Sequence, residues 1–332
     1  MSTNDCNVGT LGLSRFWIPV LVILLTLSES RGAAPGDFPS RPVRIFAPDA
    51  GGSGDTTARI IANGLTRALG QQIIVENRAG SGVIAGQAVA TAKPDGYTVL
   101  LFGSTIWLLP FLQEHVPFDP VKDLASLTLA SRTPLVLVVN PALPVKSVRE
   151  LIALANTRPG DLSYGAAIIG GANHLAPELF KSMARVNIVH IAYKGVAPAL
   201  TDLVSGRLQV MFPAASSGMP FVKAGRLRAL AVTTAQESAL APGLPTVAAA
   251  GLPGYEASYI SAAQVPAHTP PAVITRLNQE FVRVLNEPDV KEKLFGIGTE
   301  SVGSSPEELT ETMKREVAKW GKLIKEAGIR SY

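Results

Sequence analysis

Short apolar runs alternate with segments of helical periodicity along most of the chain. The first pair is the apolar run VRIFAP at 43–48 and the segment 55–70, in which Ala58, Ile61 and Leu65 recur at spacings of three and four. That spacing places apolar side chains on one face of a helix, whereas a short continuous apolar run is typical of a strand covered on both faces. The alternation predicts an α/β fold of mainly parallel sheets flanked by helices.

The alternation continues almost to the end of the chain. We expect strands at 43–48, 71–77, 97–103, 134–140, 162–167, 188–193, 208–214, 227–234 and 257–267. We expect helices at 55–70, from the glycine-rich segment 78–86 to about 93, at 147–160, from about 173, and at 197–206, 271–287 and 305–328. The segment 241–256 is rich in Pro and Gly and predicts an irregular surface stretch. This order allows two α/β lobes with a small-ligand cleft at the carboxyl ends of their strands.

The N-terminus predicts export. After Arg15 comes an apolar run at 16–27, which has the length of a secretory h-region and is too short to span a bilayer. Small residues follow, so we expect residues 1–34 to be a signal peptide cleaved between Ser30 and Ala34. The alternative is an uncleaved anchor or a buried helix.

Composition indicates the cellular compartment and argues against one class of partner. The single cysteine, Cys6, precedes the apolar run, so it is not a lipoprotein cysteine and the mature chain has none. The full chain has 332 residues, 47% of them hydrophobic. A mature chain that is somewhat shorter and has no cysteine relies on its own cores, which fits export to the periplasm of a Gram-negative bacterium. The net charge of +4 comes from scattered basic residues, which argues against nucleic acid as a partner.

A glycine-rich turn joins the first expected strand to the first expected helix. Such a turn exposes backbone N–H groups, and the positive end of the helix dipole lies over them. The candidate donors to an anionic or water-bridged ligand are the amides of Gly51, Gly52, Ser53 and Gly54. We expect Asp55 to cap the helix by accepting a first-turn N–H, and this cap is a simpler role than ligand contact.

A second turn of small residues leads into the helix expected from about residue 173. Two helix starts that face each other across a cleft would hold a carboxylate from both sides without an arginine. The candidate residues of this turn are Gly170, Gly171, Asn173 and His174. A histidine at a helix start is more often structural than a ligand contact, and both roles stay open for His174. Hydroxyl donors to the same ligand are expected from Ser104 and Thr105, just beyond a strand.

Enzymatic signatures are weak. The histidines at positions 115, 174, 190 and 268 occur singly, with no metal-ligand spacing, so we expect no metal site. The stretch GGSGD differs from a nucleophile elbow because its last residue is Asp55. The glycines of 80–86 have a spacing found in some dinucleotide sites, but no acidic residue ends the next strand at 97–103. We therefore expect no catalytic residues, no cofactor and no enzymatic activity.

Several longer stretches carry a family resemblance. They include PVRIFAPDAGGSGDTTARIIANGLTRALGQQIIVENRAGSG, KPDGYTVLLFGS, FDPVKDLASLTLASRTPLVLVVNP, HLAPELFKSMA, IAYKGVAPALTDLVSGRLQVMF and LPTVAAAGLPGYEA. With the export signal and the closing helices, they resemble the extracytoplasmic receptors of tripartite tricarboxylate transporters, called Bug proteins in Bordetella. The resemblance covers essentially the whole mature chain.

The resemblance implies a type II periplasmic-binding-protein fold, in which the chain crosses between two lobes twice. The crossings would fall near SRTPLV and YISAAQ, giving one lobe from 35–132 plus 262–332 and another from 133–261. The resemblance also implies a small carboxylate ligand, held by the first loop through ordered waters and backbone amides. The receptor, expected to be a monomer, would deliver this ligand to the membrane subunits of the transporter.

Two departures from the family pattern bear on the ligand. The first loop reads PDAGG, with Asp49 where family members usually have an apolar group, and Pro213 and Ala214 stand where many members have Asp-Asn. The missing acid argues against an ordinary amino acid as ligand. Asp49 would face a cationic or hydroxylated part of the ligand, or simply solvent.

Two questions stay open at this point. Lys194 and Gly195 are expected at the rim of the site, although Lys194 is equally consistent with a surface side chain. A receptor with this fold that feeds a signalling system instead of a transporter is the alternative function.

Overall fold

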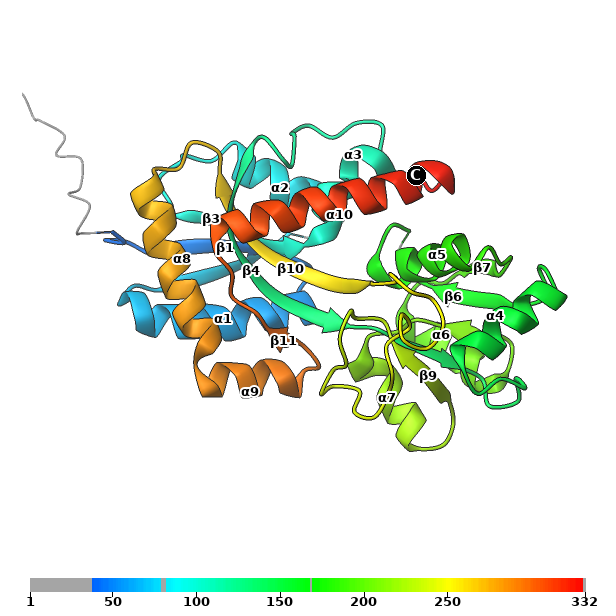
Figure 1. Cartoon of the computed structure of the whole chain (residues 1–332). Helices are drawn as coiled ribbons and strands as arrows, with labels where there is room; N and C mark the ends of the chain where they lie inside the picture. The colour runs from blue at the N-terminus through cyan, green and yellow to red at the C-terminus, as the bar shows by residue number, and fades with distance from the viewer. Residues whose placement is uncertain (1–37, 79–81, 168, 331–332) are drawn as a thin grey trace, which may run out of the picture.

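The computed structural model describes residues 38–78, 82–167 and 169–330 (Figure 1). The expected signal peptide, residues 1–34, lies outside the described residues. Within those three ranges, no helix combines the length and the hydropathy that a membrane crossing requires.

The first sheet has six strands in the order β11-β4-β10-β3-β1-β2. These are β1 Val43–Ala47, β2 Ile73–Asn77, β3 Thr98–Gly103, β4 Leu124–Pro134, β10 Ser258–Pro266 and β11 Glu300–Ser301. The accompanying helices are α1 Ser53–Leu69, α2 Val83–Ala90, the 3-10 turn η1 Ser104–Leu108, α3 Leu109–Leu112, α8 Pro271–Asn286, α9 Pro288–Gly296 and α10 Pro306–Glu326. Buried clusters on both faces pack this sheet against its helices, with α1 and α8 on one face and α2 and α10 on the other.

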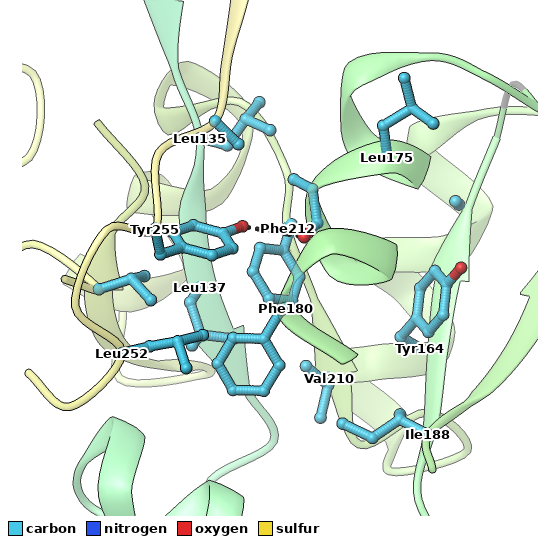
Figure 2. Packing of buried hydrophobic residues seen from close by; sticks show 14 of the residues in the cluster. Leu135, Leu137, Tyr164, Leu175, Phe180, Ile188, Val210, Phe212, Leu252 and Tyr255 are labelled. Atoms are coloured by element: carbon cyan, nitrogen blue, oxygen red, sulfur yellow. Dashed lines mark hydrogen bonds between the residues drawn. The ribbon is translucent and has the colours of Figure 1, made fainter. Parts of the chain in front are cut away.

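The second sheet has five strands in the order β7-β6-β8-β5-β9. These are β5 Val136–Val139, β6 Ser163–Ala166, β7 Val189–Ala192, β8 Val210–Met211 and β9 Arg228–Val232. Its helices are α4 Val148–Thr157, α5 Ala172–Ala184, α6 Val196–Ser205 and α7 Ala215–Lys223. Figure 2 shows the aromatic centre of this core, where the ring centroid of Phe180 lies 5.8 Å from that of Phe212 and 6.2 Å from that of Tyr255. The Tyr255 hydroxyl donates to the Ala176 carbonyl at 2.9 Å, so this buried phenol is satisfied.

The expected two-lobe α/β fold with helix-flanked sheets is confirmed. Among the named strands that the structure describes, parallel pairs join β2, β1 and β3 in one sheet and β7, β6 and β8 in the other. The strands next to the crossings, β4, β10 and β5, pair antiparallel with their neighbours. An apolar run predicts burial on both faces but does not give strand direction.

Two adjacent segments connect the lobes, as the ribbon in Figure 1 shows. β4 ends at Pro134 and β5 begins at Val136, so Leu135 is the only residue between them. On the return, the Ala257 N–H donates to the Thr233 carbonyl of the second lobe at 2.9 Å, and β10 begins at the next residue, Ser258. The two crossings therefore lie side by side, with Ser258 and Pro134 as cross-strand partners.

The lobes also touch on both sides of these crossings. On one side, Leu112 of α3 and Trp320 of α10 belong to the same buried cluster as Leu175 of α5. On the other side, the Ser238 hydroxyl of the second lobe donates to a Glu300 carboxylate oxygen of β11. The structure thus shows the lobes in contact, with a cavity left between them.

Candidate functional site

The cavity between the lobes has a volume of about 330 Å³, at the lower end of the range for small-molecule sites. From the first lobe it is lined by Pro48, Asp49, Ser53, Phe102, Thr105, Leu109, Leu112, Gln113, Thr133 and Tyr259. The crossing residue Leu135 and the second-lobe residues Ile169, Gly170, Gly171, Ala172, Asn173 and Ala214 complete the lining. The candidate residues that line it are therefore Asp49, Ser53, Thr105, Gly170, Gly171, Asn173 and Ala214.

A buried carboxylate holds the first loop, which joins β1 to α1. Asp55 accepts hydrogen bonds from the Gly51 N–H at 2.9 Å and from the Asn77 side chain at 2.8 Å, and it pairs with Arg59 at 2.9 Å. Burial alone would raise the pKa of Asp55, but these contacts outweigh it, so the pKa is lowered and the group stays ionised.

The expected cap is therefore corrected. The N-cap of α1 is Gly52, and no side chain caps the helix. Asp55 lies at the third helical position and reaches back to the loop, because its carboxylate there is directed at the amide of Gly51 rather than at an amide of its own first turn. Asp55 stabilises the loop and does not line the cavity.

In this arrangement, two of the four amides that we expect to donate to a ligand are already engaged within the loop. The Gly51 N–H is bound by Asp55, and the Gly52 N–H points to the Asp49 carbonyl at 3.3 Å. Neither residue lines the cavity, and neither does Gly54. The Ser53 amide has no acceptor among the described residues, as expected for the first turn of a helix.

The second turn offers a similar helix start from the opposite lobe. Gly171 is the N-cap of α5, and its carbonyl accepts the N–H groups of His174 at 2.9 Å and of Leu175 at 2.8 Å. The amides of Ala172 and Asn173 have no acceptor within the described ranges, and both residues line the cavity. Two helix N-termini thus present backbone donors to one enclosed space.

His174 supports this turn from behind. Its Nδ1 accepts the Gly170 N–H at 3.1 Å, and its ring lies 4.4 Å from that of His190, between ring centroids. Burial, with the neighbouring His190, lowers the pKa of His174 to about 4, so the imidazole is neutral at pH 7 and Nδ1 can accept. His174 does not line the cavity, and the structural role left open above accounts for its position.

The remaining candidates lie near or away from the cavity. Ser104 is buried and does not line the main cavity. Pro213 lies in the connection after β8, where its carbonyl accepts the Val136 N–H at 2.9 Å. Lys194 and Gly195 precede α6 and are not part of the lining.

Sequence reasoning missed most of the apolar lining. Phe102, Leu109, Leu112 and Leu135 belong to segments that have the composition of ordinary core, so no local signal distinguishes them. Thr133 and Tyr259 are cross-strand partners on β4 and β10, 126 positions apart in the sequence. Only the pairing of the two crossing strands brings them together.

The lining is mostly apolar and weakly charged. Among the described residues that line it there is no Lys, Arg or His, and Asp49 is the acidic residue. In the ranges that the structure describes, no cluster of three His, Cys, Asp or Glu side chains is arranged to hold a metal ion. Attraction for an anion must therefore come from backbone amides and neutral polar side chains.

The chain belongs to the tripartite tricarboxylate transporter family receptors, because the model of that family matches residues 57–329. The predicted family membership is thus confirmed. The family consists of periplasmic substrate-binding receptors rather than enzymes, which also confirms that the chain is not an enzyme.

Individual relatives agree over nearly the whole length. A protein of Pseudomonas sp. strain P51, described as a UPF0065 protein in the tcbD-tcbE intergenic region, is 37% identical over 98% of both chains. Protein BugT of Bordetella pertussis is 32% identical over 96% of this chain and 99% of its own. The solved structure of R. palustris Rpa4515 with adipate is 37% identical, covers 89% of this chain and 100% of its own, and gives a TM-score of 0.75.

Proposed function

We propose that this chain captures a small organic carboxylate outside the cytoplasm and delivers it to the membrane subunits of a tripartite tricarboxylate transporter. One observation carries the proposal: the N-termini of α1 and α5 present the amides of Ser53, Ala172 and Asn173 to one cavity between the lobes. Helix N-termini favour anions through their dipoles and their unpaired N–H groups. A carboxylate can bridge two such ends, directly or through ordered water.

Closure of the lobes around the ligand would be the signal that the transporter reads. We propose lobes of 35–132 plus 262–332 and of 133–261, in a protein that acts as a monomer after residues 1–34 have directed its export to the periplasm. The adjacent crossings support such a hinge, because only two short segments have to bend. Ligand binding would then shift the population from open to closed forms.

The first test is whether the protein binds an organic acid at all. Mass spectrometry of the small molecules released by denaturing the purified protein should recover an intact carboxylate. A thermal-shift screen of carboxylic acids should raise the melting temperature, since a ligand at a hundred times its Kd adds about 2.7 kcal/mol of stability. Failure of every acid to stabilise the protein would refute the proposal, as would recovery of a chemically altered ligand.

A further inference from the structure

Tyr259 lies at the point where β10 enters the first sheet and lines the cavity next to the crossings. Its cross-strand partner is Thr133 of β4, which also lines the cavity. Gly103 of β3 makes room for the phenol, because a Cβ there would lie 2.5 Å from the Tyr259 hydroxyl oxygen. Strand pairing and this glycine together fix where the hydroxyl lies.

The Tyr259 hydroxyl is available to a ligand. No hydrogen bond engages it anywhere in residues 38–78, 82–167 and 169–330, whereas the neighbouring Thr133 hydroxyl is already paired with the Thr299 hydroxyl at 2.9 Å. Burial raises the pKa of Tyr259 to about 12, so the group is protonated and can donate at neutral pH. A phenol that lines a largely apolar site in this state normally finds a polar partner.

The rest of the cavity lining limits the charge of the ligand group that can bind to the Tyr259 hydroxyl. The cavity that Tyr259 lines also includes Phe102, Leu109, Leu112 and Leu135, and among the described lining residues no cationic side chain is present to balance a second negative charge. Asp49 also lines the cavity and would repel a dianion. An unpaired charge buried among apolar side chains is costly, whereas a neutral hydroxyl or carbonyl needs only one hydrogen bond.

Given the receptor function proposed above, we propose that Tyr259 is a specificity-determining contact. It makes the cavity select a carboxylate that carries one negative charge, an apolar body and a neutral hydrogen-bonding group directed at the phenol. The helix N-termini hold the carboxylate, and Tyr259 distinguishes among acids by what their bodies carry.

Two matched series of acids test this selection by isothermal titration calorimetry. The first is hexanoate, 6-hydroxyhexanoate and adipate; the second is benzoate, 4-hydroxybenzoate and terephthalate. In whichever series binds, we expect the hydroxy acid to bind about five- to tenfold more tightly than the parent acid, as one added hydrogen bond allows. We expect the diacid to bind more weakly than the hydroxy acid.

The variant Tyr259→Phe removes only the hydroxyl. It should abolish the advantage of the hydroxy acid and leave the Kd of the parent acid within about twofold. The matched control is Tyr193→Phe, because the Tyr193 hydroxyl donates to Asp202 at 2.8 Å and Tyr193 does not line the cavity. This control should leave the whole ranking unchanged.

The outcomes separate the two proposals. If a diacid binds most tightly to the wild type, or if Tyr259→Phe preserves the preference for the hydroxy acid, the role of Tyr259 is refuted while the receptor function stands. If no acid of either series binds while the thermal-shift screen finds another acid that does, the role of Tyr259 is refuted and the receptor function stands; if no acid in the screen stabilises the protein either, both proposals fail. The order of affinities that the wild-type protein shows for the acids can refute the inference by itself. The inference therefore stays testable even if Tyr259→Phe fails to fold.

Discussion

The substitution Asp55→Asn tests how the first loop keeps its shape. Asp55 is 5% exposed and receives three donors, from Gly51, Asn77 and Arg59, at 2.8 to 2.9 Å. An asparagine keeps one acceptor oxygen but turns an NH₂ group toward at least one of these donors. Losing a hydrogen bond to a buried charged group costs about 1.5–3 kcal/mol, so we expect the free energy of unfolding to fall by about 2–3 kcal/mol. At about 2 °C per kcal/mol for a chain of this size, the melting temperature should fall by about 4–6 °C.

The same substitution has a pH signature. The pKa of Asp55 in the folded protein lies below its ordinary value of 3.8, so between the two pKa values the unfolded chain binds more protons than the folded one. The contribution of this carboxylate is therefore complete above the unfolded pKa and is lost as pH falls through the folded pKa. The stability difference between wild type and Asp55→Asn should be full at pH 7 and shrink below about pH 4.

Urea denaturation at pH 7 and pH 3.5 measures both effects. The control is Glu311→Gln, an exposed carboxylate paired with Lys314 at 2.8 Å, which should leave stability unchanged. The loop also positions Ser53, so we expect Asp55→Asn to weaken the best-binding acid about tenfold. An Asp55→Asn protein as stable as the wild type at pH 7 would refute the account of the loop.

Three further predictions concern the rest of the cavity. The wild type should lose up to about 3 kcal/mol of stability as pH falls from 6.5 to 4, because the folded pKa of His174 is lowered and protonation blocks Nδ1, and His174→Gln should not show this loss. Melting curves against pH measure the effect, with the exposed His115→Gln as control. Equal pH slopes in the two variants would contradict the prediction. Gly170→Ala should weaken acid binding at least tenfold, because Gly170 has a φ of +77° and its new Cβ would lie 2.5 Å from Leu112 of the other lobe; calorimetry measures the loss, and wild-type affinity would show that the lobes do not need this approach. Asp49→Asn should improve adipate relative to hexanoate about tenfold, or about 1.4 kcal/mol, by removing a like charge; an unchanged ratio of the two Kd values would exclude Asp49 from the selection.

Local periodicity was enough to find most of the elements. The apolar spacing in 55–70, 271–287 and 305–328 agrees with α1, α8 and α10, because these helices bury one stripe and expose the rest. α10 also carries a capping box between Ser305 and Glu308.

The long strand β4 was not predicted, because its sequence is mixed rather than apolar. Thr128 is buried there, yet it is satisfied by donating to the Ser304 carbonyl at 2.8 Å. α7 was missed because Gly218 and Pro220 lie inside it and lower its helix propensity. In both cases distant packing overrides local preference.

For the candidate site, the two glycine turns were visible because a helix start after small residues is a local feature. The pairing of Asp55 with Gly51 was not, since both residues looked like independent contributors. Tyr259 and Leu112 depend on strand order and on lobe contact, which no local pattern encodes. The sequence therefore indicates the two turns between which we propose that an anion binds, but not the side chains that would surround the rest of the ligand.

A crystal structure of the protein with its tightest-binding acid tests the central claim most directly. We predict that the carboxylate lies between the N-termini of α1 and α5, hydrogen-bonded directly or through one water to the amides of Ser53 and of Ala172 or Asn173. A ligand whose carboxylate instead pairs with a basic side chain, or lies outside the cavity, would contradict the account.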